Sequence, residues 1–108
     1  MIVTIFRSRL RPEAVEEYTE RAIQMSELVR SMPGYVSHKV FTAQDGERVT
    51  VVEFEDAEAQ QNWAINAEHL RAKAKGRKSF YAEYKVQVCT VVREAHFAAK
   101  EQLGLTRL

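Results

Sequence analysis

The side chains best suited to chemistry in this sequence lie in one segment, residues 62–69, at steps of three and four. On a helix these steps place Asn62, Asn66 and His69 on one side, with Trp63 and Asn66 on the adjoining side. A neutral imidazole can accept a proton from a bound ligand, because its ordinary pKa lies near neutral pH. An indole can stack on an aromatic ring, and the amides can orient a carbonyl or dioxygen. The segment therefore indicates a site for a small aromatic ligand, with His69 as the base.

Each of these four residues also has a purely structural interpretation. His69 could support a break in the helix, and Asn66 could mark a helix end, where asparagine is common. Trp63 could be an ordinary core residue of an amphipathic helix. Asn62 could simply face solvent. The sequence leaves both interpretations open.

Two further side chains are candidates for contacting a ligand. Arg7 shares a strand face with Val3 and Ile5, and a buried arginine requires an anionic partner. We expect that partner to be Glu53 on a neighbouring strand, with an anionic ligand as the alternative. Tyr81, at the start of the last strand, either offers its hydroxyl to a ligand or packs in the core.

Other chemistries find little support in the sequence. His38 lies on a strand face with apolar neighbours and is interpreted as structural. The spacing of histidines, carboxylates and the single cysteine matches no known metal site, so we expect no tightly bound metal. The sequence contains no glycine-rich phosphate loop, which argues against a Rossmann-type flavin or nicotinamide site.

The elements that must position these residues alternate between strand and helix. Apolar alternation predicts four strands, over residues 2–10, 35–42, 48–55 and 81–93. Apolar steps of three and four predict two helices, over residues 12–32 and 57–75, the second with a break near Asn66. Asp45–Gly46 predicts the turn of a hairpin. This βαββαβ order predicts a ferredoxin-like α+β fold, an antiparallel four-stranded sheet with both helices on one face.

Two helices can cover only one face of such a sheet, and its strands are apolar on both faces. We therefore expect the open face to pack against a second copy of the chain, giving a homodimer. The 108 residues are expected to form one domain over 1–93, followed by a helical tail over 94–108.

Charge and hydropathy bear on partners and location. The net charge of +1 gives no general attraction to nucleic acid or to an anionic membrane. No apolar run approaches the roughly 20 residues of a membrane span, and the opening residues are too polar for a signal peptide. A cytoplasmic location is expected.

With these features in place, the chain resembles the antibiotic biosynthesis monooxygenase family over roughly residues 1–93. The residues that carry the resemblance are Met1–Glu13, Met32–Tyr35, Asp45–Gly46, Asn62–Trp63, Glu68–Leu70, Phe80–Tyr81 and the strand up to Arg93. The resemblance implies a dimeric α+β barrel with a pocket between sheet and helices in each subunit.

The same resemblance implies a reaction. Characterised members of the family include oxygenases of phenols and quinols that use no metal or flavin, with molecular oxygen as co-substrate. His69 would then take the phenolic proton, and Trp63 would hold the aromatic ring. Asn62 or Asn66 would steady the oxygen species. The function expected from the resemblance is a cofactor-independent monooxygenase of a small aromatic or quinol-type substrate.

Two other functions remain open on the sequence. Haem-degrading relatives pair an asparagine on the first strand with the tryptophan and a more distant histidine. Here the first strand offers Arg7, and His69 follows Trp63 more closely, so haem binding is less favoured. A non-catalytic dimeric protein for ligand binding or stress response is excluded by nothing in the sequence.

Overall fold

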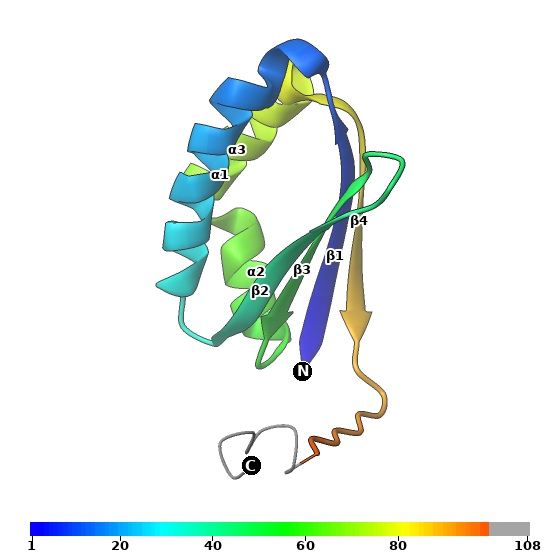
Figure 1. The fold of residues 1–108 in the computed structure, drawn as a ribbon. Coiled ribbons are helices and arrows are strands. Elements are labelled where there is room, and N and C mark those ends of the chain that lie inside the picture. The colour runs from blue at the N-terminus through cyan, green and yellow to red at the C-terminus, as the bar shows by residue number, and fades with distance from the viewer. Residues whose placement is uncertain (100–108) are drawn as a thin grey trace, which may run out of the picture.

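The structure is a computed structural model that describes residues 1–99 (Figure 1). Its elements follow the predicted order, with the second helix divided in two. In chain order they are β1 (Ile2–Leu10), the 3-10 helix η1 (Pro12–Ala14), α1 (Val15–Arg30), β2 (Tyr35–Thr42), β3 (Arg48–Phe54), α2 (Ala57–Ile65), α3 (Ala67–Lys75), the π-helical turn η2 (Gly76–Phe80) and β4 (Tyr81–Thr90). The predicted ferredoxin-like α+β fold is confirmed.

The four strands form one antiparallel sheet in the order β2-β3-β1-β4. The helices lie together on one face of this sheet (Figure 1). β1 is central and pairs along most of its length with β3 on one side and β4 on the other. Gly46, with φ +91°, closes the β2–β3 hairpin as its sequence indicated.

A β-bulge at the start of β2 changes the face of one aromatic residue. Strict alternation groups Tyr35 with Ser37, but the register shifts between them, because Tyr35 pairs with Phe54 and Ser37 with Glu53. The bulge turns Tyr35 toward the helices, where it packs against the core. Single-strand alternation could not reveal this shift, since an inserted residue is visible only in the pairing with β3.

The last strand ends earlier than predicted, at Thr90 rather than at Arg93. Pairing with β1 stops there, because Thr90 lies opposite Ile2, the first residue of β1. Residues 91–99 form neither helix nor strand. The helix predicted within the tail is therefore not formed over residues 94–99, and the remaining tail residues lie outside the described part of the chain. None of the helices within residues 1–99 is long and apolar enough to cross a membrane.

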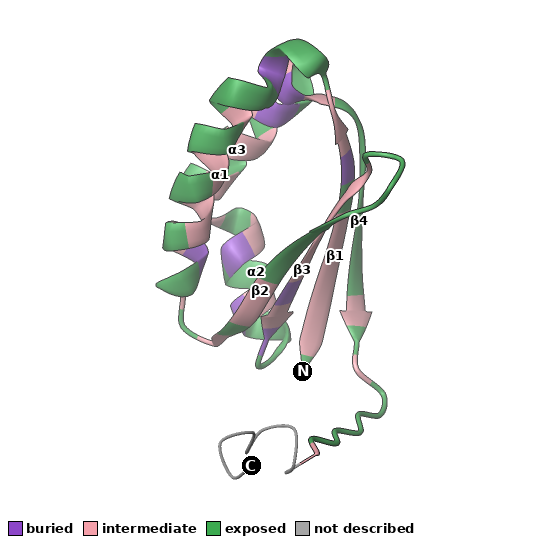
Figure 2. Cartoon of the chain, viewed as in Figure 1, coloured by how far each residue is buried: buried purple, intermediate pink, exposed green. Residues whose placement is uncertain are grey.

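The buried residues gather toward the two ends of the helix–sheet interface (Figure 2). One cluster, near the end of α1, consists of Val29, Val52, Phe54, Ala59 and Trp63. At the other end Ala14 and Phe80 are buried, and the Phe80 carbonyl accepts a hydrogen bond of 2.8 Å from the backbone N–H of Arg11. The middle of the interface is packed less densely, and this is where the structure contains a cavity.

The face of the sheet turned away from the helices has an apolar strip on β3 and β1, with Glu53 beside Val3 and Lys39 beside Val51, and a charged end rich in ion pairs. Val3, Ile5, Val49 and Val51 occupy the middle on neighbouring strands. At the charged end, Arg7 pairs with Glu47 at 2.8 Å, and Arg9 pairs with Asp45 at 2.8 Å and with Glu83 at 3.1 Å. The open face is thus only partly apolar.

The predicted pairing of Arg7 with Glu53 is wrong. In the antiparallel register Glu53 lies opposite Val3, whereas Arg7 lies opposite Val49. The next residue of the same face beyond Val49 is Glu47, which brings its carboxylate within reach of Arg7.

Gly34 and Gly46 together offer a test of how closely α2 packs against the turn that precedes β2. Both have positive φ, but a Cβ at Gly34 would overlap the side chain of Ala59, whereas one at Gly46 meets nothing within 4 Å. We expect Gly46→Ala to lower the free energy of unfolding by about 1–2 kcal/mol through backbone strain alone. Gly34→Ala should cost on the order of 1–3 kcal/mol more, because α2 must also move. Urea denaturation measures both, and equal losses would contradict the close approach of α2 to the Gly34 turn.

Candidate functional site

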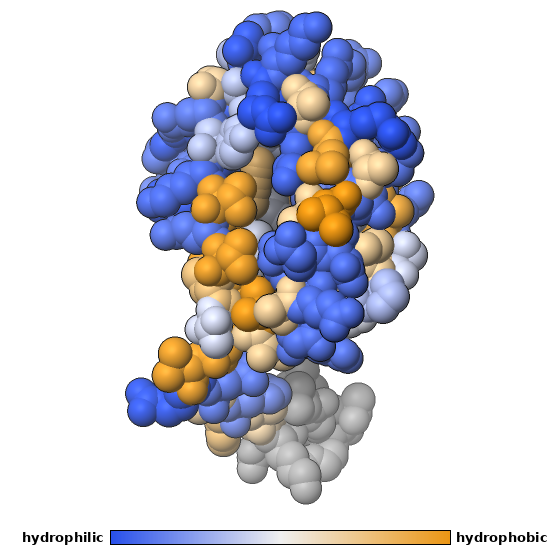
Figure 3. All heavy atoms as spheres, turned by 180° about the vertical axis from the view of Figure 1, so that it is seen from behind, coloured by the Kyte–Doolittle hydropathy of each residue, from blue (hydrophilic) through white to orange (hydrophobic). Residues whose placement is uncertain are grey.

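A cavity of about 250 Å³ lies between the sheet and the helices, and we call it the inner cavity. Its lining residues include Thr4 and Phe6 of β1, His38 and Val40 of β2, Arg48 and Val52 of β3, Trp63 of α2, His69 and Lys73 of α3, Tyr81, Tyr84 and Val86 of β4, and Tyr18 and Met25 of α1. Tyr84 and Val86 remain 40% and 49% exposed, so the cavity reaches the surface beside β4. Seen from behind, the molecule is hollowed between apolar side chains (Figure 3).

His69 lies on the wall of this cavity and is held in a defined orientation. Its Nδ1 is 2.9 Å from the backbone carbonyl oxygen of Trp63. A carbonyl can only accept, so Nδ1 must carry the proton and donate it. In the neutral ring, Nε2 on the other side then keeps a free lone pair. The geometry therefore prepares His69 to accept a proton at Nε2.

The surroundings of His69 favour the neutral ring. Burial lowers the pKa of the imidazole below its usual 6.5, the hydrogen bond to Trp63 opposes that shift, and Lys73 adds to it. The imidazole also stacks on the Trp63 indole, with ring centroids 4.0 Å apart and planes 12° from parallel. Trp63 thus has one ring face covered by His69, and it is 8% exposed within the core. It is a core residue and a cavity wall at once.

Asn66 ends α2 and begins α3, and this explains the predicted break in the helix. Its Oδ1 accepts hydrogen bonds from the backbone N–H groups of Glu68 and His69, at 3.0 and 3.2 Å. Its Nδ2 lies 3.8 Å from the sulfur of Met32. Both ends of the amide are engaged, and Asn66 is not part of the cavity lining. The predicted contact of Asn66 with an oxygen species has no support here, because the amide serves as a helix cap that positions His69.

Tyr81, for which the sequence left open a ligand contact or core packing, lines the inner cavity. A register shift between Arg9 and Leu10 lets Tyr81 reach the helix-facing side of the sheet. There its ring meets the rings of Phe6 and Tyr84, with centroids 5.4 and 5.5 Å apart. Burial, followed by the neighbouring Tyr18, raises the pKa of the Tyr81 hydroxyl. The hydroxyl therefore stays protonated and able to donate a hydrogen bond.

Two of the candidate ligand-binding residues lie outside the inner cavity. Asn62 is exposed, because the helix face that buries Trp63 turns the preceding residue toward solvent. Arg7 lies on the open face of the sheet, since Thr4 and Phe6 line the cavity and odd-numbered residues of β1 point the other way. Contact with a ligand in this cavity is therefore not supported for Asn62 or Arg7.

His38 lines the cavity, although its sequence context suggested only a structural role. Its Nδ1 lies 2.7 Å from the Tyr35 hydroxyl, and its Nε2 lies 3.1 Å from the Ser26 hydroxyl. Burial, and then the charge of Arg30, lowers the pKa of His38. Because both ring nitrogens already have partners, His38 is less available than His69 as a base. The β2 bulge that brings Tyr35 beside His38 hid this arrangement from the sequence.

Arg48 was also missed by the sequence analysis. It begins β3 on the helix-facing side, in phase with Thr50 and Val52. Its guanidinium lies 5.3 Å from the centre of the Tyr18 ring, and its Nε is buried with no hydrogen-bond partner among the described residues. The signal was present in the alternation, which placed a basic residue in phase with core positions.

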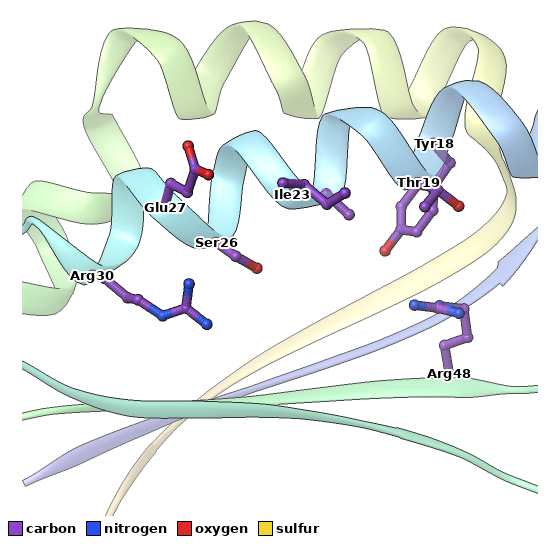
Figure 4. A pocket seen from close by; sticks show the side chains of 8 residues that line it. Tyr18, Thr19, Ile23, Ser26, Glu27, Arg30 and Arg48 are labelled. Carbon is purple, nitrogen blue, oxygen red and sulfur yellow. The ribbon is translucent and has the colours of Figure 1, made fainter.

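A second hollow of about 370 Å³, which we call the outer cleft, adjoins the inner cavity beneath α1 (Figure 4). Its lining residues are Tyr18, Thr19, Ala22, Ile23, Ser26, Glu27 and Arg30 of α1 together with Arg48 of β3. Figure 4 shows Arg48 extending from the sheet toward Tyr18 on α1. Tyr18, Ala22, Ser26 and Arg48 line both spaces, so Arg48 stands at the boundary between them.

Comparison with known proteins identifies the family. The sequence model of the antibiotic biosynthesis monooxygenase family matches residues 1–75. The uncharacterized protein YqjZ of Bacillus subtilis is 32% identical over 90 residues, which cover 83% of this chain and 79% of YqjZ.

Solved structures share the fold at lower identity. Rv0793 from Mycobacterium tuberculosis has a TM-score of 0.78 at 21% identity, covering 88% of this chain and 98% of that one. SnoaB from Streptomyces nogalater, a cofactor-independent oxygenase, has a TM-score of 0.73 at 15% identity, covering 86% of this chain and 94% of that one. Because the family model matches residues 1–75, more than half of this chain, the chain belongs to the antibiotic biosynthesis monooxygenase family.

Proposed function

We propose that this protein is a cofactor-independent monooxygenase that oxidises a small phenolic or quinol-type aromatic in the inner cavity. The observation that carries the proposal is the orientation of His69. Its Nδ1–H is committed to the Trp63 carbonyl, so Nε2 is the basic nitrogen of a cavity-lining ring. The oxygenase activity of SnoaB, a protein of the same fold, supports the choice of reaction.

The proposed reaction begins with transfer of the substrate's phenolic proton to Nε2 of His69. The resulting phenolate passes one electron to dioxygen, and the substrate radical and superoxide combine to form a carbon–oxygen bond. The peroxide then loses water, so that one oxygen atom becomes a quinone carbonyl and the other leaves as water. The substrate supplies all the electrons, and dioxygen is the only co-substrate. The protonated Tyr81 hydroxyl is a suitable donor to the developing oxygen charge.

The size and character of the inner cavity limit the substrate. At about 250 Å³ the cavity is smaller than the roughly 300–1,000 Å³ of most drug-sized ligand sites. Phe6, Met25, Trp63 and Val86 give it apolar walls. These dimensions favour a substrate of one or two fused rings.

Removing the base tests this reaction. We expect His69→Ala to slow oxygen uptake with dihydroxynaphthalenes by roughly 10²–10⁴-fold, the usual contribution of a general base. In the parent protein the rate should fall as the pH drops through a value below 6.5, because burial lowers the pKa of His69 and only the neutral ring accepts a proton. Oxygen-electrode measurements between pH 5 and 8 provide both results.

Gln61→Ala serves as the control, because Gln61 is an exposed residue of α2 that leaves His69 and its contacts in place. Its rate and pH profile should match those of the parent protein. If His69→Ala consumed oxygen as fast as the parent, the base would have to be another group. A parent protein that consumed no oxygen with any substrate of the panel would contradict the proposed function itself.

We also propose that the protein acts as a homodimer through the open face of its sheet. Val3, Ile5, Val49 and Val51 lie together on that face, and none of the helices in the described part of the chain covers them. Apolar side chains on adjacent strands gain free energy when a second sheet removes them from water. The ion pairs of Arg7 and Arg9 border this strip at one end, as a polar rim borders many interfaces.

The dimer is tested by placing a charge in the strip. We expect the parent protein to sediment with the mass of two 12.4 kDa chains, and Ile5→Glu to sediment as a single chain, because a buried carboxylate without a partner is costly. Gln24→Glu, a charge added on the exposed surface of α1, should remain dimeric. A monomeric parent at micromolar concentration would refute this assembly.

A further inference from the structure

We infer that the ligand of the inner cavity carries a carboxylate, and that Arg48 binds this group and thereby sets the charge specificity of the site. The inference deepens the proposed function, on which it rests for the position of the ligand. It names a substrate class, a one- or two-ring aromatic carboxylic acid, which neither the family nor the base His69 requires.

The first support is that Arg48 lacks the ion pairs that the other arginines of the sheet, Arg7 and Arg9, form within residues 1–99. Arg7 and Arg9 donate to carboxylates at 2.8 Å on the open face. Arg48, on the helix-facing side, has no ion pair within residues 1–99, and its buried Nε has no hydrogen-bond partner there. A buried guanidinium nitrogen that lacks an acceptor is costly, and an anionic ligand group would remove that cost.

The second support is the charge of the cavity wall. Its fully charged side chains are Arg21, Arg48 and Lys73, and within residues 1–99 no aspartate or glutamate lines it. Lys73 has a weak partner, the Ala64 carbonyl at 3.4 Å. In a hollow with largely apolar walls, like charges of this kind raise the local potential and favour an anion. A neutral ligand would leave that potential unbalanced.

The third support is the preorganisation of the Arg48 side chain. Its guanidinium is held over the Tyr18 ring, 5.3 Å from the ring centre, at the boundary of the inner cavity and the outer cleft. A planar guanidinium fixed in this way can donate two parallel hydrogen bonds to a carboxylate. The aromatic body of the ligand would extend from this point into the inner cavity, among Phe6, Met25 and Trp63.

Calorimetric titration with two probes of nearly equal shape tests the inference. 2-Naphthoate carries the carboxylate, and 2-naphthamide is its neutral counterpart, so that neither probe depends on oxygen chemistry. We expect the parent protein to bind 2-naphthoate at least tenfold more tightly than 2-naphthamide, and the preference to shrink in high salt. Arg48→Met should abolish the preference while changing the affinity for 2-naphthamide less than twofold. Arg48→Lys, which keeps the charge and loses the planar fork, should retain part of it.

Arg71→Met is the matched control, because it removes the same charge from an exposed position on α3. It should keep the full preference for 2-naphthoate. Equal binding of the two probes to the parent protein, binding of neither, or a full preference retained by Arg48→Met would each overturn the inference. The outcome is separable from oxygen uptake: a carboxylate preference without oxygenase activity would sustain the role of Arg48 and refute only the proposed reaction.

Discussion

The hydrogen bonds from the backbone of α3 to the side chain of Asn66 are the interaction on which the candidate site depends. They begin a new helix immediately after α2 and so change the direction of the chain between Trp63 and His69. In an unbroken helix these two residues, six positions apart, would point to different sides. The break instead lets the imidazole stack on the indole and donate to the Trp63 carbonyl. One polar side chain thus determines the orientation of the proposed base.

The cavity beside this base is a consequence of how the core is distributed. Phe54 and Trp63 fill one end of the helix–sheet interface, and Phe80 fills the other. The middle of the interface is left to residues that are only partly buried, and several of them are polar. A small domain gains its stability from dense packing. An open middle, in which the Thr4 hydroxyl and Arg48 Nε find no partner among residues 1–99, is therefore a costly feature. Costly features of this kind are typical of ligand sites.

The sheet separates two different electrostatic environments. On its open face each arginine of β1 is neutralised by carboxylates of the hairpin or of β4, at one end of the apolar strip proposed as the dimer contact. On its helix-facing side Arg48 has no such partner among residues 1–99, and it lines the same cavity as two histidines whose pKa values are lowered by burial. Assembly and ligand binding would therefore use opposite faces of the same four strands, and a change in one need not disturb the other.

The sequence by itself determined the order of the elements, the hairpin at Asp45–Gly46 and the helix break near Asn66, because these follow from local periodicity and capping. The stacking of His69 on Trp63 was decided by the tertiary structure. The sequence also left open whether Asn66 contacts a ligand or caps a helix, and the cap became visible only in the positions of the α3 amides. The partner of Arg7, the place of Tyr35 beside His38 and the presence of Arg48 in the cavity were decided by the tertiary structure. Each depends on strand register or on a β-bulge, and these are properties of paired strands that no single strand encodes.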